Sequence, residues 1–255
     1  MEITVNGIKT NYISQGSGET VLFLHGWGAN VGLFDALINF VSKRYKAVAL
    51  DLPGFGGTEE PPTPWCVSDY CEFVKDFLRQ IEIVPTVIIC HSFGGRLAIK
   101  LSGEGILNSV RKIVFIDSAG IKPKKTAKQK FKLATYKIGK AVLSFAPIKA
   151  IFPDALENLR KKRGSLDYQN ATPLMRQVLV KVVNEDLTHL LPKVSASSLL
   201  IWGTNDTATP ISDGEAFEKL IPDAGLVKIE GAGHFSYLEA PDFCQRVIGS
   251  FLKIN

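Results

Sequence analysis

Short runs of apolar residues, rich in Val, Ile and Leu, recur along the chain and end in polar or glycine-rich turns. Runs of this length without polar interruptions are typical of strands that are buried on both faces of a parallel sheet. The predicted strands of this kind are Thr20–Leu24, Lys46–Leu50, the run from Val87 into Cys90, Lys112–Ile116, Ser197–Trp202 and Gly225–Glu230.

The first residues show a different pattern, in which apolar and polar positions alternate. Ile3–Val5 and Lys9–Ser14 have this period of two, and Asn6-Gly7 lies between them. Asn-Gly favours a type I′ turn, because both of its central residues need a positive φ. We therefore expect an antiparallel hairpin ahead of the first buried strand.

Segments with helical periodicity separate most of the predicted strands. They are Leu33–Val41, a helix to about Ile81 with Ser68 as its N-cap, the segment that follows Gly95, Ser212–Leu220 and Pro241–Leu252. Alternation of strand and helix with right-handed crossovers implies a mostly parallel sheet with helices on both faces. The predicted fold class is therefore α/β.

This alternation stops after Gly120. For about 70 residues only helical segments are predicted, roughly 124–146, 148–152, 154–163, Pro173–Asn184 and Leu187–Leu191. They contain too few apolar residues for a separate core. We therefore expect one domain, with a first core part at 1–120, a helical cap insertion at 121–192 and a second core part at 193–255.

The charge of the chain is concentrated in this insertion. Residues 121–190 contain 15 Lys and Arg against 5 Asp and Glu, whereas the remainder contains 15 against 20. A solvated helical surface explains such a segment, and so does steering of anionic substrates or loose attachment to an acidic surface. Aromatic residues are not interleaved with these cations, so nucleic-acid binding is not predicted.

The composition is ordinary for a soluble globular protein, at 45% hydrophobic and 22% charged residues over 255 positions. The start of the chain lacks the pattern of a signal peptide, and no apolar run approaches the ~20 residues of a membrane-spanning helix. We therefore expect a cytoplasmic protein. Its four cysteines, at 66, 71, 90 and 244, lack zinc-ligand spacing, so we expect free, mostly buried thiols and no metal or cofactor.

The stretch from Val87 to Gly95 carries the strongest chemical signal. It predicts a strand, a sharp turn with Ser92 at its apex, and a helix that begins at Phe93-Gly94-Gly95. A hydroxyl at such an apex projects from its own backbone, and the N–H groups of the helix start point toward developing negative charge. The usual pattern G-x-S-x-G begins here with Cys90, which is small enough for the turn.

Ser92, Asp206 and His234 each follow a predicted strand. The chain order Ser, Asp, His is the one expected for hydrolases whose serine lies on a strand-to-helix turn. A serine hydroxyl needs a base to take its proton, and an imidazole titrates near neutral pH. We predict that Ser92 is the nucleophile, that His234 is the base and that Asp206 orients the imidazole. Asp117, which also ends a strand, is the rival carboxylate.

Five motifs in this order resemble the α/β-hydrolase superfamily over essentially the whole chain. The resemblance is closest to its branch with a helical cap after the sixth strand. The motifs are His25-Gly26-Trp27, Asp51-Leu52-Pro53-Gly54-Phe55-Gly56, His91-Ser92-Phe93-Gly94-Gly95, Gly203-Thr204-Asn205-Asp206 and Gly233-His234-Phe235.

The resemblance implies roles for further residues. The backbone N–H groups of Trp27 and Phe93 are expected to form the oxyanion hole. His25 is expected to have a structural hydrogen-bonding role. His91 lies on the strand side of the turn and is expected to point elsewhere, and His189 is expected at the surface or in cap packing.

The leading functional interpretation is a serine hydrolase, most directly a carboxylesterase for small or medium acyl esters. C–C bond hydrolysis, thioester hydrolysis and peracid formation by a perhydrolase use the same apparatus. A proline iminopeptidase would need acidic cap residues, which this basic segment does not favour. A non-catalytic ligand receptor is the alternative from another class. The expected partner is a small acyl substrate, and both a monomer and a homodimer fit.

Overall fold

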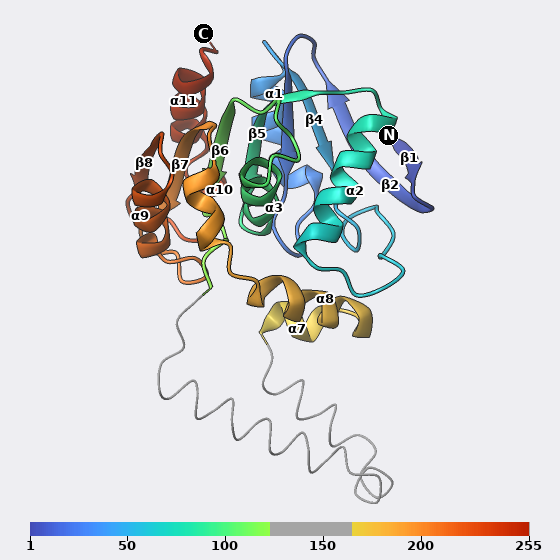
Figure 1. Ribbon diagram of the computed structural model, residues 1–255. Helices are drawn as coiled ribbons and strands as arrows, with labels where there is room; N and C mark the ends of the chain where they lie inside the picture. Colours follow the sequence, from blue (N-terminus) through green and yellow to red (C-terminus); the bar gives the residue numbers. More distant parts are fainter. Residues whose placement is uncertain (123–164, 255) are drawn as a thin grey trace, which may run out of the picture.

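The computed structural model of the chain describes residues 1–122 and 165–254 (Figure 1). The helices predicted at 124–146, 148–152 and 154–163 lie outside these residues, as does most of the proposed cap at 121–192. The division of the chain into core and cap therefore remains a prediction.

One sheet of eight strands organises the described residues, in the order β1-β2-β4-β3-β5-β6-β7-β8. β1 and β2 form the predicted antiparallel hairpin, and β2 is also antiparallel to β4. All other neighbouring strands are parallel. The strands are β1 Glu2–Val5, β2 Ile8–Gln15, β3 Thr20–Leu24, β4 Lys46–Leu50, β5 Pro85–His91, β6 Lys112–Ile116, β7 Ser197–Gly203 and β8 Ala224–Ile229.

The α/β prediction is confirmed, and three strands (β3, β4 and β6) have the predicted bounds. These three strands are apolar on both faces, and the residues Val21–Leu24 of β3 are fully buried. A strand of this kind needs no alternation to be recognised, since helices cover both sides of it.

Helices and 3₁₀ segments surround this sheet. They are η1 Val31–Phe34, α1 Asp35–Val41, α2 Val67–Gln80, α3 Phe93–Gly103, α7 Leu166–Asn170, α8 Pro173–Asn184, η2 Thr188–Lys193, α9 Ile211–Leu220, α10 Ser236–Glu239 and α11 Pro241–Leu252. Buried side chains of α2, α3 and α9 form one core with one face of the sheet, and those of α1 and α11 form a second core with the other.

The prediction of Ser68 as a helix N-cap is wrong. α2 begins at Val67, and its N-cap is Cys66, whose backbone N–H donates to the Asp69 carboxylate at 2.7 Å. The carboxylate three positions after the cap satisfies a backbone donor that the helix leaves free. The acidic residue, rather than the nearest hydroxyl, therefore sets the start of this helix.

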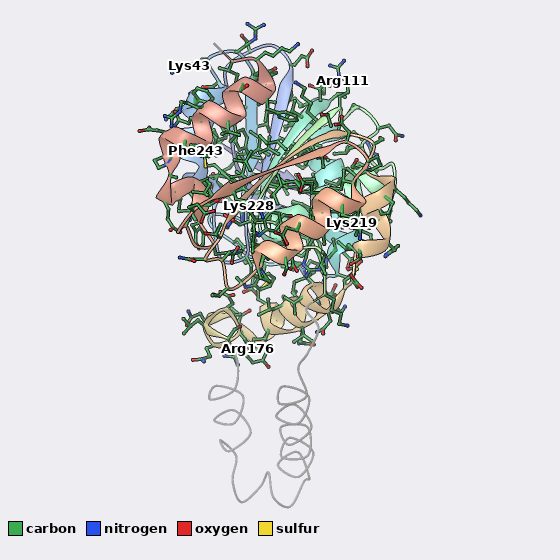
Figure 2. The ribbon with its side chains drawn as sticks, turned by 90° about the vertical axis from the view of Figure 1, so that its left-hand side faces the viewer. Lys43, Arg111, Arg176, Lys219, Lys228 and Phe243 are labelled. Atoms are coloured by element: carbon green, nitrogen blue, oxygen red, sulfur yellow. The ribbon has the colours of Figure 1, made fainter. Side chains whose placement is uncertain are left out.

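β8 lies at one edge of the sheet. It pairs only with β7 among the described strands, and its Lys228 forms an ion pair of 2.7 Å with Glu215 of α9. Figure 2 views this side of the molecule, with Lys228 and Lys219 labelled. A lysine on an edge strand discourages pairing with a further strand.

The junction of β5 and α3 leaves no room for side chains at its glycines. A Cβ placed on Gly94 would lie 2.0 Å from the Leu24 carbonyl oxygen at the end of β3. A Cβ on Gly95 would lie 1.7 Å from the Ser118 hydroxyl. The two glycines therefore let α3 start directly against the neighbouring strand ends.

We expect Gly94→Ala to lower the free energy of unfolding by about 3 kcal/mol, because the added methyl group must displace main chain rather than a mobile side chain. Urea titration measures this loss. Gly225→Ala in β8 is the matched control, since a Cβ there meets nothing within 4 Å. Equal unfolding free energies for the two variants would contradict the close-approach argument.

Candidate active site

Ser92 occupies a strained turn between β5 and α3. Its backbone has φ 48° and ψ −110°, a region that residues with a side chain rarely adopt. Its N–H donates to the Ile116 carbonyl at 3.2 Å, and its carbonyl accepts from Gly95 and Ala119 at 3.0 and 2.9 Å. These bonds hold the strained conformation from β6 and from α3, so the hydroxyl position is fixed by the sheet.

The His234 imidazole lies between the other two predicted site residues. Its Nε2 is 2.9 Å from the Ser92 Oγ, and its Nδ1 is 2.8 Å from the Asp206 Oδ2. A carboxylate accepts only, so the proton of the neutral imidazole resides on Nδ1. Nε2 is then left with a lone pair that faces the Ser92 hydroxyl.

Asp206 is held in place by its own turn. The N–H groups of Ala208 and Thr209 donate to its Oδ1 at 2.8 and 3.0 Å, and the Thr209 hydroxyl lies 2.7 Å from its Oδ2. Burial alone would raise the pKa of Asp206, but the hydrogen bonds from His234 and Thr209 outweigh burial and hold the pKa below its usual value. The carboxylate is therefore ionised at neutral pH.

The rival carboxylate, Asp117, makes other contacts. It is fully buried, and it accepts from the Gly203 N–H at 2.9 Å and from the Ser236 N–H and hydroxyl at 3.0 and 2.6 Å. Asp117 thus joins the end of β7 to the segment after His234, whereas Asp206 contacts the imidazole itself. Burial raises the pKa of Asp117 to about 6.

The two amides predicted for the oxyanion hole belong to segments that adjoin Ser92. Phe93 is the first residue of α3, where a helix leaves N–H groups free. Trp27 follows Gly26, where an added Cβ would lie 3.2 Å from the Ser92 Cβ. Within residues 1–122 and 165–254, neither amide donates to another protein group.

His25 has hydrogen bonds at both ring nitrogens, in line with its expected structural role. Its Nε2 accepts from the Leu52 N–H at 2.9 Å, and its Nδ1 lies 2.7 Å from the Gly26 carbonyl. Burial lowers its pKa, so the ring stays neutral. His25 therefore joins the loop after β3 to the loop after β4.

Aromatic rings and a methionine pack around the serine turn. The Phe93 ring contacts those of Trp27 and Tyr70 edge-on, with centroids 5.7 and 5.2 Å apart. Met175 of α8 lies against Gly54, where a Cβ would be 2.4 Å from its Cε. α8 therefore packs over the loops at the carboxyl ends of the strands. Phe145, Phe152 and Leu156 of the predicted cap, which with Met175 are candidates to line a substrate pocket, lie outside the described residues.

The cysteines are free, as predicted, and three of the four are buried. No group of three or more metal-ligating side chains occurs in the described ranges. Among the helices described, none has the length and apolar character needed to cross a membrane.

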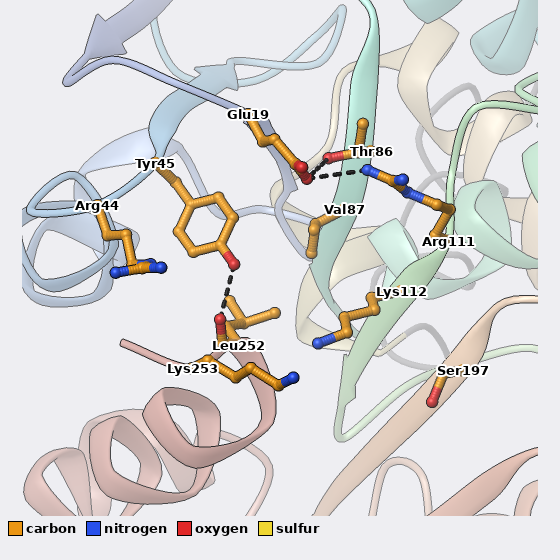
Figure 3. A pocket seen from close by; sticks show the side chains of 10 residues that line it. All are labelled: Glu19, Arg44, Tyr45, Thr86, Val87, Arg111, Lys112, Ser197, Leu252 and Lys253. Carbon is orange, nitrogen blue, oxygen red and sulfur yellow. Dashed lines mark hydrogen bonds and ion pairs between the residues drawn. The ribbon is translucent and has the colours of Figure 1, made fainter. Parts of the chain in front are cut away.

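A cavity of about 340 Å³ lies at the amino ends of the parallel strands, where β5, β6 and β7 begin (Figure 3). Two of its cations have local partners. Arg111 pairs with Glu19 at 3.1 Å, and the Lys112 Nζ donates to the Phe251 carbonyl at 2.7 Å, where it also offsets the negative end of α11. Ser92 follows the other end of β5, so this cavity is separate from the candidate site.

A family model described as "alpha/beta hydrolase fold" matches residues 19–241. The chain is an α/β hydrolase. This match covers all five motifs, as well as His234 and the two residues that its imidazole contacts.

Several named enzymes are similar to this α/β hydrolase over nearly its whole length. The 2-(acetamidomethylene)succinate hydrolase of Mesorhizobium japonicum is 21% identical, with 98% of this chain and 94% of the relative covered. The 2-hydroxy-6-oxo-6-(2'-aminophenyl)hexa-2,4-dienoic acid hydrolase of Metapseudomonas resinovorans is 23% identical, with 98% and 90% covered. The solved enol-lactonase of Burkholderia xenovorans LB400 has a TM-score of 0.76 at 19% identity, with 99% and 100% covered.

Sequence reasoning missed the residues that position the three candidate catalytic side chains of this α/β hydrolase. Thr209 carried only the weak signal of a hydroxyl three positions after Asp206. Asp117 was considered as a rival acid, and its contact with Ser236 depends on a segment more than 100 residues away. His91 was expected to point elsewhere, but its ring lies against His234, with centroids 5.0 Å apart.

We expect the unfolding free energy of Asp117→Asn, relative to wild type, to increase by up to about 3 kcal/mol between pH 4 and pH 7. The pKa of Asp117 is about 6 in the folded chain against 3.8 without the fold, so folding takes up a proton in this window. The stability that this proton confers at acid pH is lost as pH rises through 6. Urea titrations across the range measure the difference, and a constant difference would contradict the raised pKa.

Proposed function

We propose that this α/β hydrolase is a serine hydrolase that cleaves carboxylic esters of small or medium acyl groups, with Ser92, His234 and Asp206 as its catalytic residues. The position of the His234 imidazole, within hydrogen-bond distance of both the serine hydroxyl and a carboxylate, carries this proposal. A serine on a strained strand-to-helix turn and two free amides beside it support the same chemistry.

The first half of the reaction forms an acyl-enzyme. The Ser92 Oγ attacks the ester carbonyl carbon while its proton passes to the His234 Nε2, and the Asp206 carboxylate stabilises the resulting imidazolium. The carbonyl electron pair becomes an oxyanion, which the amides of Trp27 and Phe93 stabilise. Each such donor lowers the activation free energy by about 3 kcal/mol. The intermediate expels the alcohol, which takes the proton from Nε2.

The second half of the reaction returns the enzyme to its starting state. Water gives a proton to the His234 Nε2 as its oxygen attacks the acyl carbon. The oxyanion forms again on the same two amides. Its collapse releases the carboxylic acid, and the proton on Nε2 returns to the Ser92 oxygen. No cofactor is required for any step.

C–C bond hydrolysis is the second candidate. The relative from Metapseudomonas resinovorans, whose name gives an unsaturated oxo acid as its substrate, shares 23% identity over 98% of this chain. The same serine, base and oxyanion donors would serve either bond. Parallel assays with short p-nitrophenyl esters and with a vinylogous diketone acid distinguish ester hydrolysis from C–C bond hydrolysis. The substrate class with the higher kcat/KM identifies the activity.

We expect Ser92→Ala to lower kcat for p-nitrophenyl acetate by at least about 10⁴-fold, because no other group can form the acyl-enzyme. Purified wild type and variant are compared by release of p-nitrophenol, with circular dichroism to show that both are folded. Turnover that persists in the variant would refute the assignment of Ser92. A wild type that binds esters without turnover would instead indicate a ligand receptor.

We expect Asp206→Asn to lower kcat by about 10³- to 10⁴-fold, since an amide favours the wrong imidazole tautomer and does not stabilise the imidazolium. Asp213→Asn is the matched control. Asp213 is partly buried and its charge interacts with that of the more deeply buried Asp206, but it makes no hydrogen bond to His234. Similar losses in both variants would show that Asp206 has no special role.

A further inference from the structure

His91, the residue before the nucleophile, has one ring nitrogen in use and one buried without a partner. Its Nε2 lies 2.7 Å from the carbonyl oxygen of His234. Its Nδ1 makes no hydrogen bond, and it is the single buried side-chain nitrogen or oxygen of this kind among the described residues. The residue is 1% exposed, so solvent does not satisfy this nitrogen.

The contacts of the ring determine its tautomer. A carbonyl oxygen can only accept, so the proton resides on Nε2 and Nδ1 presents a bare lone pair. Burial lowers the pKa of His91 to about 3, so the ring stays neutral. On the Nδ1 side lies Gly26, where an added Cβ would be 2.7 Å from that nitrogen. The ring therefore lies between the loop that precedes the Trp27 amide and the loop that carries His234.

The segment around His234 is held by hydrogen bonds at Gly233, His234 and Ser236. The Gly233 N–H donates to the Glu239 carboxylate at 3.0 Å, and the Ser236 N–H donates to Asp117 at 3.0 Å. The contact from His91 is the one at the carbonyl of His234 itself. The other two bonds fix the neighbours of the base, whereas this bond fixes the peptide group to which its side chain is attached.

We propose that His91 is a positioning residue for the proposed hydrolase reaction: its Nε2–H bond to the His234 carbonyl, with its bare Nδ1 edge against Gly26, sets the distance between the base and the oxyanion-hole loop. This inference rests on the proposed function of Ser92 and His234. His91 does not touch the reacting atoms, and it acts through the backbone of the base and through Gly26.

Stability alone does not explain an imidazole at this position. A phenyl ring of similar shape would lose the Nε2–H bond to the His234 carbonyl, but it would also remove the buried acceptor that lacks a hydrogen bond, and these two effects on stability oppose each other. The ring packs against His234, Phe235 and Tyr237, with centroid distances of 4.9 to 5.1 Å, and a phenyl ring could keep this packing. What only a histidine supplies is a donor toward His234 together with an edge that has no hydrogen toward Gly26.

The test compares His91→Phe, which keeps the ring and removes the donor, with wild type. The first readout is the rate at which a fluorophosphonate probe labels Ser92, since this reaction needs the serine and its base but no particular acyl group. The second is the split between kcat and KM with the best ester found. We expect the labelling rate and kcat to fall about 10- to 100-fold with KM nearly unchanged, because displacing the base misaligns proton transfer.

Two further variants separate positioning from packing. His91→Gln can place an amide N–H near the former Nε2, so we expect it to recover part of the lost labelling rate. Ile89→Ala, at a fully buried position of the same strand, removes packing but leaves the His234 contact intact. We expect it to lower Tm and to be labelled at nearly the wild-type rate, whereas His91→Phe changes Tm little.

The outcomes are distinguishable. If the probe does not label wild type, the proposed function fails, and the positioning role fails with it. If wild type is labelled and His91→Phe reacts equally fast, only the positioning role is overturned. If His91→Phe and Ile89→Ala lose labelling in proportion to their loss of Tm, with no rescue by His91→Gln, the effect is one of packing and the positioning role is also overturned.

Discussion

The backbone turn at Ser92 is the constraint on which the candidate site depends. A residue with a side chain is held at φ 48° there because its own amide and carbonyl are bonded to β6, to α3 and to the turn after β6. The cost of such strain, about 1–3 kcal/mol, is offset by the buried sheet around it. Close approach of the main chain at Gly26 and Gly94 follows from this turn, since any side chain there would collide with its neighbours.

A second consequence is that the site is built across the sheet rather than within one segment. Ser92, Asp206 and His234 follow the ends of β5, β7 and β8, and His234 bridges the other two. Groups from other strand ends hold Ser92 and His234, whereas Asp206 is held by its own turn. The buried Asp117 of β6 ties the Gly203 amide to Ser236, and the His91 ring contacts the carbonyl of the base. Small shifts of Asp117 or His91 would change the distances from His234 to Ser92 and Asp206, although these three residues stay the same.

Much of this arrangement could be predicted from the sequence, and the exceptions have physical reasons. Strands such as Thr20–Leu24 were predicted with their bounds because burial on both faces leaves an uninterrupted apolar run. The start of α2 was predicted two residues late, because Asp69 bonds back to Cys66. α10, of four residues, is too short to show a helical period. The supports of His234 depend on pairs such as His91 and residue 234, which are 143 positions apart, so no local pattern indicates them.

The most direct test of the central claim is to locate the residue that becomes covalently modified. Intact protein is treated with a fluorophosphonate, digested and mapped by mass spectrometry, in parallel with His234→Ala. Our account predicts one adduct, on Ser92, that forms in wild type and is nearly absent from the variant. An adduct on another serine, or equal labelling of Ser92 with and without the His234 imidazole, would contradict it.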